Sequence, residues 1–276
     1  MHILIAGCGD IGNLLAVGLI EQGHRVTGLK RNISTLAEGI EPYCADLTDA
    51  TSLEKLPDDI DVLVFMPTPV SRNETAYREI FINGWKNLKN SLRNTPRLSV
   101  IVSSTAVLGQ SDGSVVDEAS ETVPPGFNGK VLLELEQLAS SDMPASVIVR
   151  LSGIYGPGRE RQINMAMSDV LEIQEKPPYF INCIHREDAA AVLQHVMTLQ
   201  NPAALYLASD DAPVSRFELI GWLAQTMGRP SPKGLTIPGA GQGKQVSNKR
   251  LRDSGYRFRY ADYKAGYKSL LARRDR

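Results

Sequence analysis

Two kinds of hydrophobic pattern alternate along the first two thirds of the chain. Short, continuous apolar runs are typical of strands buried on both faces of a sheet. Longer stretches with an apolar residue every three or four positions predict helices. The strands are predicted at 2–6, 25–29, 41–45, 61–65, 98–103 and 145–151. The helices are predicted at 10–22, 73–93 and 128–138. This alternation predicts an α/β fold with a doubly wound parallel sheet of the Rossmann type.

The pattern is less regular after residue 153. A turn at 156–158 precedes a helical stretch that we expect to run to about 173, followed by a strand at 179–184. Further on we predict a helix at 187–199, a short strand at 205–208 and a helix at 215–227. We therefore divide the chain into residues 1–152, which hold the regular sheet, and 153–276, which partly complete the sheet and partly form a small C-terminal lobe.

Composition excludes several classes of partner and site. Hydrophobic residues make up 42% and the formal net charge is −1, so we expect neither nucleic acid nor a membrane as a partner. No apolar run reaches the length of a membrane span. The three cysteines lie far apart, which fits a reducing cytoplasm, and no cysteine or histidine cluster has the spacing of metal ligands. We expect a cytoplasmic protein without a metal site.

A glycine loop joins the first predicted strand to the first helix. Gly7 permits a tight turn, Gly9 lets the backbone approach a pyrophosphate, and Gly12 lets the helix pack close to the strand. Asp10 and Ile11 begin the helix, whose N-terminus favours anions. The alternative is an ordinary glycine turn, but the flanking strand and helix favour a dinucleotide site. Residues 1–152 are thus expected to bind NAD or NADP.

The end of the second predicted strand bears on the choice of nicotinamide cofactor. NAD sites usually place an acidic residue there, but residues 22–37 contain none. The strand ends instead at Lys30 and Arg31, two cations that suit the 2′-phosphate of NADP. The alternative is that both are solvated surface charges. The sequence therefore favours NADP and leaves NAD as an alternative. Pro67, which follows the fourth predicted strand, is expected to line the same cofactor site.

Several motifs in a fixed order resemble those of the extended short-chain dehydrogenase/reductase family, also named NAD-dependent epimerase/dehydratase. Each motif is modest alone, and their order makes the resemblance specific. The matching segments are DLTD at 46–49, SSTAVLG at 103–109, RLSGIYGPG at 150–158, NCIHREDA at 182–189 and RYADYKAG at 259–266.

The resemblance implies a fold, a cofactor and a class of substrate. Asp46 and Leu47 match the positions at which family members meet the adenine. The C-terminal segment would be a substrate lobe. Family substrates are commonly nucleotide sugars or related carbonyl compounds, and the reaction usually begins with hydride transfer. A small-molecule substrate and a monomer or homodimer are therefore expected.

The catalytic residues of the family are only partly present. Family members use a serine or threonine together with a tyrosine and a lysine spaced YxxxK on a helix. Ser104 matches the serine, although a hydroxyl that bonds the local backbone is an equal alternative. The tyrosine position is Asn128 and the lysine position is Leu132. Because neither side chain exchanges a proton near neutral pH, the family's proton relay is missing.

Other groups could take part in catalysis or substrate binding. Tyr155 lies by resemblance on a substrate-side loop, where it could act as an acid, although a packing role is more common. Arg159 and Arg161 could hold a phosphate or carboxylate, or be solvated loop charges. Asp188 is expected to cap the helix that follows it. The single YxxxK, from Tyr260 to Lys264, lies far from the expected helix and is attributed to chance.

These observations leave three functions in competition. The first is an NADP-linked epimerase, dehydratase or reductase with an atypical mechanism. The second is a dinucleotide-dependent sensor or regulator with little catalysis, suggested by the loss of both Tyr and Lys. The third, a structural protein that no longer binds nucleotide, is opposed by the complete set of three loop glycines. We prefer the first.

Overall fold

The computed structural model describes residues 1–168 and 171–274 and divides the chain into two compact units. Unit 1 comprises residues 1–107, 122–150 and 190–206, and unit 2 comprises 108–121, 151–189 and the part of 207–276 that is described. Each unit is thus assembled from separate stretches of chain. One of the crossings between the units, at 150–151, lies close to the boundary expected from the sequence at 152–153.

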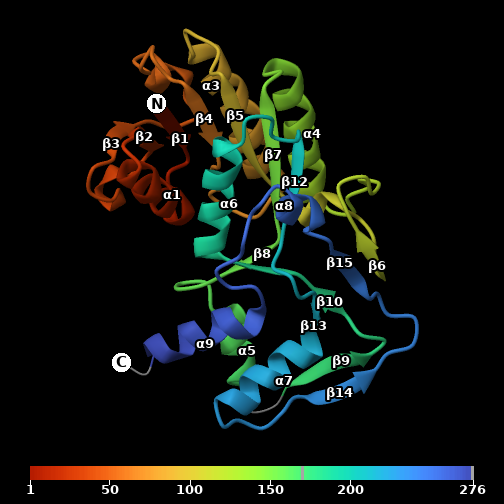
Figure 1. Cartoon of the computed structure of the whole chain (residues 1–276). Coiled ribbons are helices and arrows are strands. Elements are labelled where there is room, and N and C mark those ends of the chain that lie inside the picture. The colour runs from red at the N-terminus through yellow and green to blue at the C-terminus, as the bar shows by residue number, and fades with distance from the viewer. Residues whose placement is uncertain (169–170, 275–276) are drawn as a thin grey trace. The chain divides into compact units, whose positions relative to one another are not determined.

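A seven-stranded sheet forms the framework of the fold (Figure 1). Its strand order is β12-β7-β5-β4-β1-β2-β3, and β1 pairs in parallel with both β2 and β4. The reversal of strand order beside β1 is the mark of a doubly wound sheet, so the predicted fold is confirmed. The strands are β1 His2–Ala6, β2 Arg25–Lys30, β3 Glu41–Cys44, β4 Val62–Phe65, β5 Leu98–Ser104, β7 Ser146–Leu151 and β12 Leu205–Ala208.

The helices of unit 1 follow the predicted pattern with one irregularity. In α1 (Asp10–Glu21) the side chains of Ile11, Leu15 and Leu19 are buried, as their helical spacing predicts. The predicted helix at 73–93 consists of α2 (Glu74–Arg78), a π-helical turn η3 (Glu79–Asn83) and α3 (Gly84–Ser91). The helix that should carry the catalytic pair is α4 (Phe127–Asp142). α6 (Arg186–Thr198) begins in unit 2 and ends in unit 1.

Unit 2 contains short strands that the sequence pattern did not predict. The helical stretch expected up to 173 ends early: α5 covers Arg161–Ala166 and strand β9 covers Glu172–Lys176. Further strands that were missed include β6 (Asp112–Val116), β14 (Lys233–Thr236) and β15 (Gly243–Val246). These strands are rich in glycine and polar residues, so they lack the apolar alternation that marks a strand, and pairing with distant segments defines them.

The remaining elements of unit 2 agree better with expectation. The predicted strand at 179–184 is two strands in different sheets, β10 (Phe180–Ile181) and β11 (Cys183–His185); β11 pairs with β8 (Gly153–Tyr155). The capping box that Ser215 and Glu218 predict is present at the start of α7 (Arg216–Thr226). Helix α7 packs against α5 and β9 (Figure 1). The other elements are β13 Val214–Ser215, α8 Lys249–Asp253 and α9 Tyr263–Arg274.

A buried ion pair joins α4 to two strands of the sheet in unit 1. Arg150 on β7 donates from Nε and Nη2 to the two oxygens of Glu136 on α4, at 2.9 and 2.6 Å. Ser103 on β5 donates to Glu136 Oε1 at 2.5 Å. Arg150 and Glu136 are 4% and 6% exposed, so each charge depends on the other for its compensation. The network therefore fixes the position of α4 on β5 and β7.

We expect Glu136→Gln to lower the free energy of unfolding by about 3–5 kcal/mol, because it leaves a buried guanidinium without its counter-charge. The matched control is Glu134→Gln on the same helix, since Glu134 pairs with Arg78 at the surface. An exposed pair contributes little, so the control should cost under about 1 kcal/mol. Urea unfolding of both variants measures the difference. Equal losses would show that the buried pair has no special role.

Candidate functional site

The turn from β1 into α1 can be formed only by glycine. Gly7 has φ +90°, and a Cβ on it would lie 2.5 Å from Cα of Pro67. The amides of Gly7 and Cys8 both donate to the carbonyl of Leu29 on β2. The turn is thus tied to β2 on one side and pressed against the end of β4 on the other, where Pro67 follows the strand. This places the start of α1 at the carboxyl ends of three neighbouring parallel strands.

The other two loop glycines leave an open approach to the start of α1. A Cβ on Gly12 would lie 3.3 Å from Sγ of Cys8 and 3.4 Å from Cγ2 of Ile5, so this glycine allows close helix–strand packing. A Cβ on Gly9 would meet only the carbonyl oxygen of Gly7, at 3.9 Å. Gly9 is also the N-cap of α1 and, as a glycine, has no side chain that could cap the first amides of the helix. The amide end of a helix beside an open face suits a pyrophosphate.

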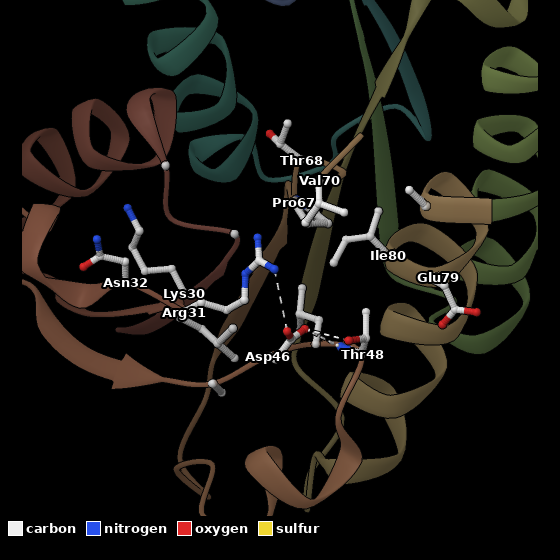
Figure 2. A pocket seen from close by; sticks show the side chains of 16 residues that line it. Lys30, Arg31, Asn32, Asp46, Thr48, Pro67, Thr68, Val70, Glu79 and Ile80 are labelled. Carbon is white, nitrogen blue, oxygen red and sulfur yellow. Dashed lines mark hydrogen bonds and ion pairs between the residues drawn. The ribbon is translucent and has the colours of Figure 1, made fainter. Parts of the chain in front are cut away.

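A cavity of about 480 Å³ lies beside this loop, wholly within unit 1 (Figure 2). Seven of the predicted cofactor residues line it: Gly7, Gly9, Lys30, Arg31, Asp46, Leu47 and Pro67. Asp10, Ile11 and Gly12 form the adjoining first turn of α1 and are not among the lining residues. Lining residues that the sequence did not single out include Asn32, Thr48, Thr68, Glu79 and Ile80. The last two belong to the π-helical turn, a feature often found at functional sites.

Two basic and two acidic residues line this cavity. Arg31 reaches toward Asp46, with Nη1 3.8 Å from Oδ2 (Figure 2). Asp46 Oδ1 accepts from the amide and hydroxyl of Thr48 at 2.9 and 2.8 Å. Burial raises the pKa of Asp46, but these hydrogen bonds and the charge of Arg31 outweigh it, so the net pKa lies below the ordinary value. Within the described part of the chain, Lys30 Nζ donates only to the Thr35 hydroxyl, at 2.6 Å.

Asn13 connects the glycine loop to the segment that follows Lys30 and Arg31. Its Nδ2 donates to the carbonyls of Gly9 and Thr35, both at 3.0 Å, and its Oδ1 accepts from the amide of Ala37 at 2.8 Å. One amide side chain therefore fixes the glycine loop relative to the segment that follows Arg31. The sequence analysis missed this residue, because a polar residue one turn into a helix carries no distinctive signal.

The start of α4 packs directly on the segment that follows Ser104. A Cβ on Gly129 would lie 2.4 Å from the carbonyl oxygen of Ala106, so glycine is required for this contact. Ser104 Oγ accepts from the amide of Ala106 at 3.1 Å, which is the local backbone bond weighed as the alternative for this residue. Asn128 is half-buried with Oδ1 turned toward Gly126, and Leu132 is 6% exposed within the core. Neither position on α4 carries an ionisable group.

Comparison with known proteins decides the family. The statistical model of the NAD dependent epimerase/dehydratase family matches residues 3–197, more than half of the chain. The chain belongs to the NAD-dependent epimerase/dehydratase family. Protein YeeZ of Escherichia coli K12 is 26% identical over 274 residues, which cover 94% of this chain and 96% of YeeZ.

Solved structures agree with this assignment. A candidate NAD-dependent epimerase/dehydratase from Methylobacillus flagellatus is 35% identical, with a TM-score of 0.84, over 100% of this chain and 99% of that one. MoeE5, solved with UDP-glucose and NAD, has the same fold at 20% identity, with a TM-score of 0.80 and coverage of 100% and 99%. The predicted family and fold are therefore confirmed.

Tyr155 lies in the core of unit 2, which corrects its expected position on a substrate-side loop. It is 3% exposed, stacks on Tyr267 with ring centroids 4.4 Å apart, and meets the ring of His185 edge-on at 5.3 Å. Burial raises its pKa far above the ordinary value, and the nearby Asp210 adds to the shift. A tyrosine packed in this way is a core aromatic. Its exclusion from the surface opposes the predicted role as an acid.

Asp188 does not cap a helix, contrary to expectation. It is the third residue of α6, and its carboxylate accepts from the amides of Arg259 and Tyr260 at 2.8 and 3.0 Å and from the Tyr256 hydroxyl at 2.8 Å. It thus anchors the segment before α9 within unit 2. Because Tyr260 precedes α9 while Lys264 lies on it, the YxxxK at these positions is not formed on one helix.

The other predicted substrate residues lie at the surface of unit 2. Arg159 follows the turn at Gly156, whose carbonyl accepts from its amide at 2.8 Å, and Arg161 is the first residue of α5. Both are exposed, and their role in substrate binding stays a prediction. Across 1–168 and 171–274, no cluster of His, Cys, Asp and Glu could hold a metal, and no helix is long and apolar enough to cross a bilayer.

Proposed function

We propose that this protein is an NADP-dependent enzyme that acts on a nucleotide sugar or related carbonyl compound without the family's Tyr/Lys proton relay. The cavity beside the glycine loop carries the proposal, because it combines a phosphate-binding turn with two cations at the end of β2. MoeE5, whose fold is the same, was solved with UDP-glucose and NAD, which supports the substrate class. A cytoplasmic location and a monomeric or homodimeric state belong to the same proposal.

The lining residues fit the parts of a nicotinamide dinucleotide. The loop at Gly7 and Gly9, with the first turn of α1 from Asp10 to Gly12, would take the pyrophosphate. Asp46 and Leu47 would meet the adenine, and Pro67 would close the cavity beside Gly7. When bound, the nicotinamide donates or accepts a hydride.

Lys30 and Arg31 have the charge and reach to hold the 2′-phosphate of NADP. The nearest acid, Asp46, is 3.8 Å from Arg31 and so pairs with it loosely. Lys30 has only a hydroxyl partner among the described residues. Neither cation is therefore neutralised by a close carboxylate, whereas a site for the ribose hydroxyls of NAD would need an acceptor at the end of β2. This arrangement favours NADP.

The chain's own residues limit the mechanism that can operate. Ser104 could donate its hydroxyl to a substrate oxygen while still accepting from Ala106. Asn128 could orient a substrate oxygen through its amide, but it cannot give up a proton near neutral pH. Proton transfer would therefore fall to water or to the substrate. Arg159 and Arg161 are the cations proposed to take an anionic part of the substrate.

A non-catalytic sensor is the second candidate. It is favoured by Leu132, which fills the lysine position with a core side chain and removes the charge that would activate a proton donor. In this case cofactor binding would change a partner interaction or the oligomeric state. Turnover distinguishes the two functions.

We predict that the natural chain binds NADPH at least about tenfold more tightly than NADH. Either Arg31→Ala or Lys30→Ala should remove most of this preference, because each variant loses a charge-assisted hydrogen bond to the 2′-phosphate. Titration followed by nicotinamide fluorescence measures both affinities. Lys86→Ala, at an exposed position outside the cavity, controls for general loss of charge. Equal binding of the two cofactors by the natural chain would refute the 2′-phosphate site.

We also predict turnover of a nucleotide sugar such as UDP-glucose with NADP⁺ as hydride acceptor, or of a small carbonyl compound with NADPH as hydride donor. The kcat should fall by about 10²-fold in Ser104→Ala, because one hydrogen bond to the developing charge is lost. Ser140→Ala, at the exposed end of α4, is the control. Unchanged kcat in Ser104→Ala would remove that residue from the mechanism. No turnover, together with a cofactor-dependent change in sedimentation, would favour the sensor.

A further inference from the structure

A second cavity, of about 540 Å³, lies wholly within unit 2. Its walls come from the loop after β12, from the end of β15 and from α8 with the residues that follow it; we name it the α8 cleft. None of the predicted cofactor or substrate residues lines it. Its volume is in the range of cavities that hold small metabolites. The proposed function therefore leaves this cleft unexplained.

Three basic side chains line the α8 cleft, and one of them has no acidic partner. Lys249 pairs with Asp253 at 2.5 Å, and Arg252 lies 3.6 Å from Asp211. Arg257 Nη1 donates to the main-chain carbonyls of Arg252 and Tyr256, at 3.3 and 2.9 Å. No carboxylate among the described residues bonds to Arg257. The cleft thus contains one positive charge with donors left for an anion.

One of the three acidic residues that line the cleft is buried and incompletely bonded. Asp210 is 1% exposed; its Oδ1 accepts from the amide of Ala212 at 3.3 Å, and its Oδ2 has no partner in the described part of the chain. Burial raises the pKa of Asp210 to about 8, and the nearby carboxylates of Asp262, Asp211 and Asp188 add to the shift. A carboxyl group that holds its proton can both donate to and accept from a hydroxyl.

A buried polar atom without a partner is rare in native structures and suggests a missing water or ligand. Arg257 and Asp210 are both wall residues of the cleft, and they call for different chemistry: an anion for the guanidinium and a hydroxyl group for the carboxyl. We propose that the α8 cleft binds a small phosphorylated polyhydroxy compound of the sugar-phosphate class, with its phosphate on Arg257 and its hydroxyl groups toward Asp210.

Arg252 and Asn248 extend the same complementarity. The ion pair of Arg252 with Asp211 is long, so Arg252 can turn toward a phosphate at small cost. Asn248 is 8% exposed and donates to the carbonyl of Ser209 and to Asp211 Oδ1, which fixes the loop that carries Asp210 against α8. The phosphate side of the cleft is therefore adaptable, and the hydroxyl side is rigid.

The proposal is tested by calorimetric titration of the full chain with glucose 1-phosphate at pH 7 and constant ionic strength. We expect saturable binding to the natural chain and at least tenfold weaker binding to Arg257→Gln. Lys268→Gln removes the same charge from unit 2 at an exposed position outside the cleft, and it should bind within about twofold of the natural chain. Inorganic phosphate should compete, but with several-fold lower affinity.

Three results would overturn the proposal. Absence of saturable binding excludes the ligand class. Equal weakening in Arg257→Gln and Lys268→Gln indicates general charge attraction. Equal affinity for inorganic phosphate and glucose 1-phosphate removes the role of the hydroxyl groups and of Asp210. None of these results affects the NADPH titration, so failure here is distinguishable from failure of the proposed function.

Discussion

The contact between Gly7 and Pro67 is the constraint on which the candidate cofactor site depends. Only a residue without a Cβ can turn at that point, since any side chain would overlap the backbone after β4. The turn directs the start of α1 along the carboxyl edge of β1, β2 and β4, where parallel strands place their loops together. The cations after β2 and the carboxylate after β3 then face the same cavity. One steric requirement thus brings four loops to one site.

The same unit keeps the packing around α4 but lacks the ionisable side chains that the family places on this helix. Gly129 keeps the close contact of α4 with the segment after Ser104, and the Glu136–Arg150 pair holds the helix against β5 and β7. The scaffold that would orient a Tyr/Lys pair is therefore intact. Its two chemical positions, however, carry an amide and a buried aliphatic side chain. A protein in which the scaffold is retained and the relay is replaced can bind a dinucleotide while using other means, or none, to move a proton.

The sequence predicted the parts of the fold that local pattern determines. Continuous apolar runs identified β1, β4, β5 and β7, and helical spacing identified α1 and α4, because these elements are buried on predictable faces. The polar strands β6, β14 and β15 were missed, since their order depends on partners far away in the chain. Of the candidate site, the glycine loop and its basic neighbours could be found from motif spacing.

Other features of the site depend on tertiary packing and were misjudged or missed. Tyr155 belongs to a motif that suggests a loop, but its ring is enclosed by Tyr267 and His185. Asp188 has the sequence position of a cap and instead anchors a segment some 70 residues away, at Arg259 and Tyr260. Asn13 acts through three hydrogen bonds, two of which reach Thr35 and Ala37, 22 and 24 residues further along the chain. In all three cases the residues that decide the role lie far along the chain from the residue itself.

The central claim is that the glycine loop binds a nicotinamide dinucleotide, and Gly9→Ala tests it most directly. Gly9 has φ −88°, and its Cβ position meets only the Gly7 carbonyl oxygen at 3.9 Å, so alanine should fold with the free energy of unfolding changed by under about 1 kcal/mol. The added methyl group occupies the space left for the pyrophosphate. Calorimetric titration with NADPH should show micromolar-range binding by the natural chain and a loss of at least about tenfold in Gly9→Ala. Equal affinity of the two, or no affinity in the natural chain, would contradict the account.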